Sequence, residues 1–200
     1  MRKGDETRDR IVERAFRLAG RDGLGGLTIG SLADELEMSK SGLFAHFGSK
    51  EDLQVAVLQA AKVRFEEVVL RPAFRTRRGE PRVRALFQRW LTWTNDDPAQ
   101  PGGCIFLAAA TELDDRAGAP RDTLVASQKL LIATVAKCAR LAVEAGDFSR
   151  DLDCEQFAFE LFGIVLAFHH ARRLLRDSRA DRRALSAFER VLSGARVRRI

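Results

Sequence analysis

TIGSLADELEMSKSGLFAHFGSKEDL, residues 28–53, is the stretch of this chain with the clearest pattern of local structure. Between Ile29 and Leu36 apolar residues recur at helical spacing, and acidic residues occupy the opposite side. Thr28 and Ser39 each precede a helical pattern, where a hydroxyl can accept a hydrogen bond from an otherwise unpaired backbone N–H. Gly48 favours the end of the second helix. The stretch therefore predicts two short helices, a tight turn between them and the start of a third helix.

The two predicted helices have the dimensions of a helix-turn-helix. The second is expected to be about 10 Å long at 1.5 Å per residue, which suits insertion into a major groove about 12 Å wide. Small or polar side chains lie along its exposed side, and hydroxyls and an ammonium at helix starts suit phosphate oxygens. The candidates for DNA contact are Lys40, Ser41, Ala45 and His46 on the exposed side, and Thr28, Ser39 and Lys50 at helix starts.

The run from Ser31 to Leu53, S-L-A-x-E-L-x-M-S-K-S-G-L-F-x-H-F-x-S-K-E-x-L, closely resembles the DNA-binding segment of the TetR family of bacterial repressors. With the preceding helix, the resemblance covers roughly residues 7–54. It implies a homodimeric, ligand-responsive repressor that binds double-stranded DNA, and it adds Gly42 and Phe44 to the expected DNA-binding residues. It also implies an all-α fold, in which a three-helix head, residues 1–54, joins a larger ligand-binding and dimerisation domain, residues 55–200.

Two positions depart from the family pattern. Glu37 stands in the turn, where the family usually has Gly, and a left-handed conformation there costs a residue with a side chain about 1 kcal/mol. Phe44 stands where the family usually carries Tyr, whose phenol commonly meets a phosphate. Because a phenyl ring cannot donate a hydrogen bond, we expect His46 or Lys50 to carry more of that contact.

Composition limits the remaining classes of protein. The chain has 200 residues and a formal net charge of +6, which agrees with nucleic-acid binding. Its N-terminus is charged and leads into no apolar run, and its longest apolar stretch, Leu161 to Phe168, is far short of the roughly 20 residues that cross a bilayer. Three scattered cysteines, Cys104, Cys138 and Cys154, argue against a disulfide framework. We expect a cytoplasmic protein without membrane contact.

Helical periodicity continues to the C-terminus and predicts about nine helices in all. A long helix should begin at Lys50 and end near Leu70, because Pro72 follows. A later helix that begins after Asp153 is apolar on nearly every face, so we expect a second copy of the chain to cover one side. With the last helix it should form a four-helix dimer interface. The predicted interface residues are Phe157, Leu161, Ile164, Val165, Phe168, Leu185, Phe188 and Val191.

A small-molecule effector is expected among the middle helices, by analogy with the family. The segment from Gly102 to Asp122 is similar to one in a subgroup of TetR-type regulators with uncharacterised ligands. The candidate pocket residues are Phe65, Phe87, Trp90, Trp93, Cys104, Phe106, Ala110 and Phe162, although large apolar residues at helical spacing also fit an ordinary core. Cys104 precedes a helix, which fits either a redox-active thiol or a buried structural one.

The sequence contains no recognisable catalytic motif. It contains no P-loop and no nucleophile elbow, and the adjacent His169 and His170 lack a second ligand at helical spacing, so we expect no metal, no cofactor and no enzyme. One alternative is a helical small-molecule carrier or enzyme that retains an inert helix-turn-helix. Another is a DNA-binding protein that activates transcription or needs no ligand.

Overall fold

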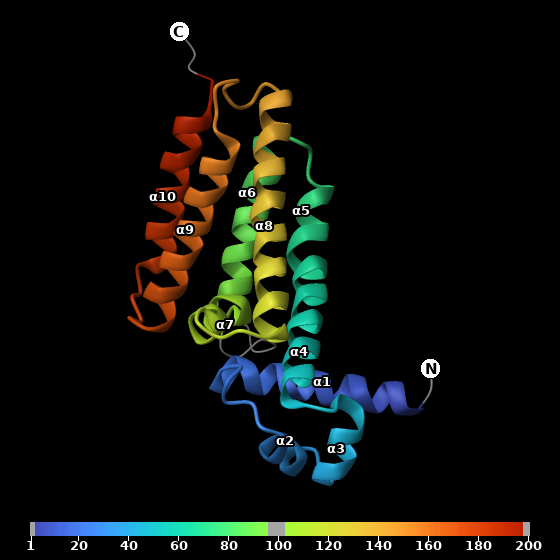
Figure 1. Ribbon diagram of the computed structural model, residues 1–200. Coiled ribbons are helices and arrows are strands. Elements are labelled where there is room, and N and C mark those ends of the chain that lie inside the picture. Colours follow the sequence, from blue (N-terminus) through green and yellow to red (C-terminus); the bar gives the residue numbers. More distant parts are fainter. Residues whose placement is uncertain (1–2, 96–102, 198–200) are drawn as a thin grey trace. The chain divides into compact units, whose positions relative to one another are not determined.

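The computed structural model describes residues 3–95 and 103–197, and its regular elements are helical (Figure 1). They are α1 (Lys3–Asp22), α2 (Ile29–Glu35), α3 (Lys40–Phe47), α4 (Lys50–Phe65), the π-helical η1 (Glu66–Leu70), α5 (Arg71–Arg75), α6 (Glu80–Thr94), α7 (Ile105–Leu113), α8 (Ala119–Glu144), α9 (Cys154–Arg173) and α10 (Ala180–Ala195). Extended pairing in the described ranges is limited to an isolated bridge between Phe148 and Arg196. Because α4, η1 and α5 follow one another without a break, the predicted all-α fold of about nine helices is confirmed for this part of the chain. None of its helices is long and apolar enough to span a bilayer.

Two compact units make up the chain. Unit 1 contains Met1–Arg64 and Asp96–Ser127, and unit 2 contains Phe65–Asn95 and Gln128–Ile200. The three helices of the predicted head therefore share a unit with most of α4, with α7 and with the start of α8. The predicted boundary between residues 54 and 55 stays a prediction.

The helix that begins at Lys50 continues past Pro72, so the predicted end near Leu70 was wrong. Proline has no N–H, and its ring collides with the carbonyl four residues earlier in a regular α-helix. Here the turn before it is π-helical, and the Arg71 N–H donates to the Glu66 carbonyl five residues back. This wider turn accommodates the proline, and the helix ends at Arg75.

In unit 1, an apolar face of α1 is buried against the helix-turn-helix. Ile11 and Ala15 are fully buried, as are Leu32 of α2 and Leu43 of α3. Polar contacts at the rim hold the same helices together: Arg14 of α1 pairs with Glu35 of α2, and the Arg8 guanidinium lies 5.0 Å from the ring centre of Phe47. The first helix therefore packs against the helix-turn-helix and supports it.

In unit 2, α6 is joined to the C-terminal helix by aromatic stacking and by charge. The Phe87 and Phe188 rings stack with centroids 3.9 Å apart. Glu80, at the start of α6, accepts from Arg84 Nε at 2.7 Å and from Arg196 Nε and Nη2 at 2.8 and 2.6 Å. Arg84 also donates to Glu189 of α10 at 2.8 Å. The hydrogen bonds from Arg196, followed by those from Arg84, lower the pKa of Glu80 to about 2.

This cluster predicts a loss of stability in acid. Because the pKa of Glu80 is lowered in the folded chain, its contribution is complete above the usual value near 4.5 and is lost as the pH falls toward 2. Between pH 5 and pH 3 the free energy of unfolding should fall by about 1 kcal/mol more in the wild type than in Glu80→Gln. Urea denaturation at both pH values measures the difference. Glu144→Gln removes an exposed carboxylate at the end of α8, and its free energy of unfolding should fall as much as that of the wild type. An identical fall in all three proteins contradicts the prediction.

Candidate nucleic-acid interface

The two helices predicted as a helix-turn-helix are each capped by a hydroxyl. Thr28 Oγ1 accepts from the Ser31 N–H at 3.1 Å and begins α2, and Ser39 Oγ accepts from the Gly42 N–H at 3.1 Å and begins α3. Glu37 in the turn has φ of 54°, as expected for a left-handed residue at the position where the related family usually has Gly. The local geometry predicted for this stretch is therefore confirmed.

Burial determines which edge of α3 faces outward. Leu43 and Phe47 are 0% and 3% exposed and belong to the core of unit 1. The opposite edge carries four exposed residues, which we call the α3 strip: Lys40, Ser41, Phe44 and Ala45. Lys40 and Phe44 are four residues apart, as are Ser41 and Ala45, so all four side chains share one side of the helix.

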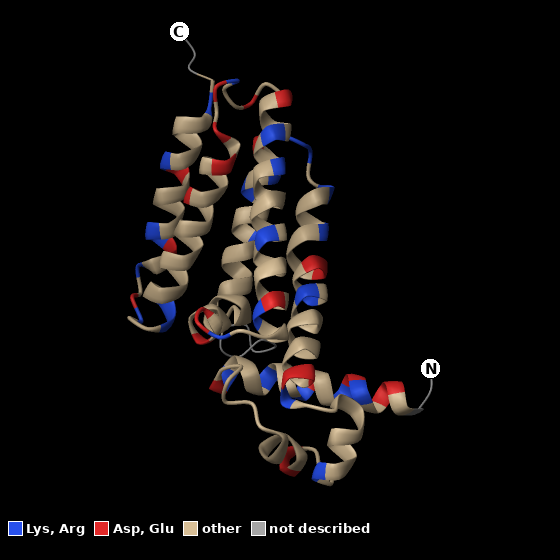
Figure 2. Cartoon of the chain, viewed as in Figure 1, with Lys and Arg blue, Asp and Glu red and all other residues tan. Residues whose placement is uncertain are grey.

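The other predicted DNA-binding residues differ in exposure. Thr28, Ser39 and Lys50 are exposed, whereas Gly42 and His46 are half-buried. The sequence of α3 includes Lys40 and no aspartate or glutamate, and in Figure 2 this helix carries blue but no red. An exposed helix edge free of carboxylates is compatible with approach to a polyanion.

Two lysines of this region are also in contact with the chain itself. Lys50 Nζ donates to the Gly25 carbonyl at 2.7 Å, so its ammonium holds the loop between α1 and α2. The end of the Lys40 side chain lies over Gly30, since a Cβ built there would be 3.6 Å from Lys40 Cε and 3.8 Å from Nζ. The Lys50 ammonium thus has a hydrogen-bond partner within unit 1, the Lys40 side chain lies near Gly30, and both side chains stay exposed.

A carboxylate from α7 binds the same loop, a contact that the sequence did not predict. Glu112 Oε1 accepts from the Leu24 N–H at 3.2 Å, and Oε2 accepts from the Gly25 N–H at 2.5 Å. Gln54 Nε2 donates to the Leu24 carbonyl at 2.9 Å. Two features favour glycine at position 23: its φ is 83°, and a Cβ there would lie 2.7 Å from Glu112 Oε1. We call Lys50, Gln54 and Glu112, with the backbone of residues 24 and 25, the loop clamp.

Nothing in the spacing of the sequence pointed to the loop clamp. Asp114 and Asp115 follow Glu112 closely, a pattern that is typical of a solvated acidic cluster. The partner of Glu112, Leu24, is 88 residues away. The glycine run of residues 23–26 was the available signal, since exposed N–H groups of glycine-rich turns form sites for anions, including side-chain carboxylates.

The residues predicted to line an effector pocket fall into both units. Cys104, Phe106 and Ala110 belong to unit 1, and Phe65, Phe87, Trp90, Trp93 and Phe162 belong to unit 2. In unit 2 the Phe65 ring meets Trp90 and Trp93 edge-to-face, with centroids 6.1 and 5.3 Å apart, and Trp90 lies 5.9 Å from Phe162. We call these four the aromatic cluster. Phe87 does not join it in any ring contact among the described residues and stacks on Phe188 instead.

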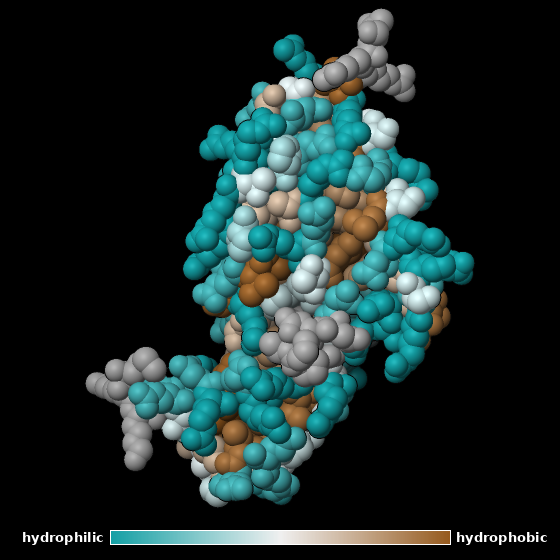
Figure 3. Space-filling model, turned by 180° about the vertical axis from the view of Figure 1, so that it is seen from behind, coloured by the Kyte–Doolittle hydropathy of each residue, from teal (hydrophilic) through white to brown (hydrophobic). Residues whose placement is uncertain are grey.

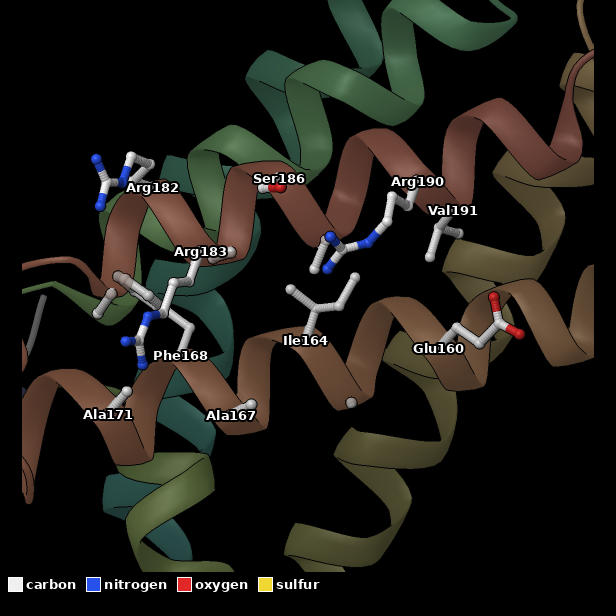
Figure 4. A pocket seen from close by; sticks show the side chains of 14 residues that line it. Glu160, Ile164, Ala167, Phe168, Ala171, Arg182, Arg183, Ser186, Arg190 and Val191 are labelled. Carbon is white, nitrogen blue, oxygen red and sulfur yellow. The ribbon is translucent and has the colours of Figure 1, made fainter.

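The structure divides the predicted dimer interface in two. Phe157, Leu161, Val165, Phe168 and Phe188 are at most 2% exposed, so they belong to the core of a single chain, and Phe168 also lines the groove described below. Their place in a dimer interface stays a prediction. Ile164, Leu185 and Val191 remain accessible. Ile164 and Val191 line a groove of about 880 Å³ between α9 and α10 (Figure 4).

Comparison with known proteins places the chain in a family. A family model described as "Tetracyclin repressor-like, C-terminal domain" matches residues 79–188, just over half of the chain. A second, described as "Bacterial regulatory proteins, tetR family", matches residues 11–57, which contain the helix-turn-helix. The chain belongs to the TetR family.

Solved structures of TetR regulators share its fold. A regulator from Chloroflexus aurantiacus J-10-FL is 22% identical, with a TM-score of 0.85 over 99% of this chain and 100% of that chain. One from Cytophaga hutchinsonii is 19% identical, with a TM-score of 0.88 over 100% and 99%. AibR, in complex with isovaleryl coenzyme A and operator DNA, is 22% identical, with a TM-score of 0.74 over 94% and 98%. At these identities the likeness is one of fold, and no curated protein matches the chain.

The loop clamp of this TetR protein predicts a local loss of order when Glu112 is truncated. Glu112→Ala leaves the Leu24 and Gly25 N–H groups without their charged acceptor, which should lower the free energy of unfolding by about 2 kcal/mol. Hydrogen exchange at those two amides should accelerate relative to the wild type. Asp115→Ala, a change to an exposed carboxylate two residues after α7, serves as the control. Unchanged exchange in Glu112→Ala contradicts the assignment.

Proposed function

We propose that this chain is a sequence-specific DNA-binding repressor that acts as a homodimer and is released from a palindromic operator by a small apolar or aromatic ligand. The observation that carries the proposal is the α3 strip, an exposed edge on a short, capped helix within a TetR helix-turn-helix. An edge of this length fits a major groove, where base pairs expose distinct patterns of donors and acceptors.

The residues around the strip suit the phosphate backbone. The Thr28 and Ser39 hydroxyls lie at the starts of α2 and α3, where unpaired N–H groups and the positive end of the helix dipole favour anions. Lys50 adds a cation at the start of the next helix. Such contacts fix the position of a protein on the duplex, and the residues of the strip then distinguish sequences.

The groove between α9 and α10 suits a second copy of the chain. Small and apolar side chains form its floor: Gly163, Ile164 and Ala167 of α9, and Ala184, Ala187 and Val191 of α10. Glu160 and Arg190 line it as well, and Figure 4 shows Arg190 extending toward Ile164 across the groove. A two-fold axis can therefore bring acidic and basic groups of the two copies together.

Further exposed apolar residues on α9 support this docking. Phe159 is 70% exposed and Leu166 is 42% exposed in a single chain, and apolar surface is visible among the hydrophilic side chains of unit 2 in Figure 3. Apolar surface of this kind commonly marks an interface. Two joined heads would then read half-sites about 34–36 Å apart, one turn of DNA.

An effector site in the aromatic cluster fits the release step. Trp90 Nε1 is buried and has no hydrogen-bond partner among the described residues. An indole N–H is a donor only, so an acceptor on an aromatic ligand would satisfy it. AibR, which shares the fold, binds both a coenzyme A thioester and operator DNA. A ligand releases DNA here to the extent that it binds the DNA-incompetent state more tightly.

DNA binding is tested with a lysine on the strip and a lysine outside it. In a gel shift on the DNA upstream of the protein's own gene, Lys40→Ala should weaken binding about tenfold, the equivalent of about 1.4 kcal/mol and typical of one base contact. Lys129→Ala removes the same charge from an exposed position of α8 and should bind as the wild type does. If neither the wild type nor a variant shifts the DNA at any salt concentration, the result favours the alternative of an inert helix-turn-helix.

The dimer is tested by placing a charge in the groove. Ala167→Glu introduces a carboxylate where the second copy should pack, and we expect the dimer to dissociate at micromolar concentration in sedimentation velocity. Binding to the palindromic site should weaken at least tenfold, since each head then binds alone. Ala133→Glu, on the exposed side of α8, should stay dimeric. A dimeric Ala167→Glu protein rules out this groove as the interface.

A further inference from the structure

The α3 strip has a polar half and an apolar half. Lys40 and Ser41 form the polar half, and Phe44 and Ala45, one turn later, form the apolar half. Phe44 is 46% exposed, whereas Phe47 on the same helix is 3% exposed. The chain thus buries one phenyl ring of α3 and leaves the other in water.

The polar half is partly engaged within the chain. Ser41 Oγ lies 3.2 Å from Ser39 Oγ in a hydrogen bond, and Ser39 Oγ also accepts from the Gly42 N–H. Lys40 lies over Gly30. Phe44, in contrast, is the largest side chain on the strip, and its ring makes no aromatic contact within the described residues.

A phenyl ring limits what this position can recognise on DNA. It offers no donor or acceptor, so it cannot bind a phosphate or a base edge by a hydrogen bond. The one apolar group that base edges present in the major groove is the C5-methyl of thymine, which apolar side chains contact. Burial of a half-exposed phenyl ring against that methyl is favourable because both surfaces leave water.

We propose that Phe44, supported by Ala45, contacts the C5-methyl of a thymine in each half-site and determines the preference for thymine at that position. The inference rests on the proposed function, because it requires α3 in the major groove. The specificity of this position would then come from an apolar contact alone. A tyrosine at the same position would add a contact to a phosphate.

Uracil substitution tests the inference, because deoxyuridine keeps every donor and acceptor of thymidine and lacks only the methyl. Duplexes obtained by selection from random DNA are made with deoxyuridine at each half-site thymine in turn, and binding is followed by fluorescence anisotropy. At one position the wild type should bind the uracil duplex about fourfold more weakly, as expected for one methyl-sized group at a tenfold change per 1.4 kcal/mol.

The same loss should be absent in Phe44→Ala and present in Phe44→Leu, which keeps an apolar side chain of similar reach. Lys129→Ala, at an exposed position of α8 outside the strip, is the control and should discriminate thymine from uracil as the wild type does. Thermal unfolding verifies that the variants are folded, as expected for a change at an exposed position.

Three outcomes overturn the inference: a selected half-site without thymine, wild-type binding that is equal on thymine and uracil at every position, and discrimination that persists in Phe44→Ala. Each of these is compatible with sequence-specific DNA binding. Failure of the proposed function is a separate result, in which no sequence is enriched from random DNA at all.

Discussion

The burial of Leu43 and Phe47 is the constraint on which the candidate interface depends. These two side chains occupy the core of unit 1, which fixes how α3 is oriented about its own axis. The four residues of the α3 strip therefore face outward. The hydroxyl caps at Thr28 and Ser39 fix where α2 and α3 begin. Recognition of DNA by this chain thus follows from hydrophobic burial on the opposite side of the same helix.

The loop clamp extends this constraint beyond the helix-turn-helix. Two side chains of α4 and one of α7 hold the backbone of residues 24 and 25 by donors and acceptors, so the loop between α1 and α2 cannot move without breaking charge-assisted hydrogen bonds. A displacement of α7 within unit 1 would therefore change the position of the loop. In the proposed repressor, the clamp connects α7 to the loop that leads into α2.

Local features of the chain were predictable from its sequence, because their partners are near in sequence. The caps at Thr28 and Ser39 and the left-handed Glu37 depend on residues at most four positions away, and all three are present. The contact of Glu112 with Leu24 was not predictable, because its partner comes from a distant segment. Pro72 was misread as the end of a helix, since a π-helical turn absorbs it. The sequence did not separate the residues of α9 that its own chain buries from those left accessible, because the helix is apolar on nearly every face.

Selection of bound sequences from random duplex DNA tests whether the α3 strip reads base pairs in a dimer of this chain. We expect an enriched inverted repeat whose half-sites are centred one helical turn of about 10–10.5 base pairs, or a multiple of it, apart. Lys40→Ala should shift the base preference within each half-site. Recovery of no enriched sequence by folded, dimeric protein would contradict the claim that the α3 strip reads DNA.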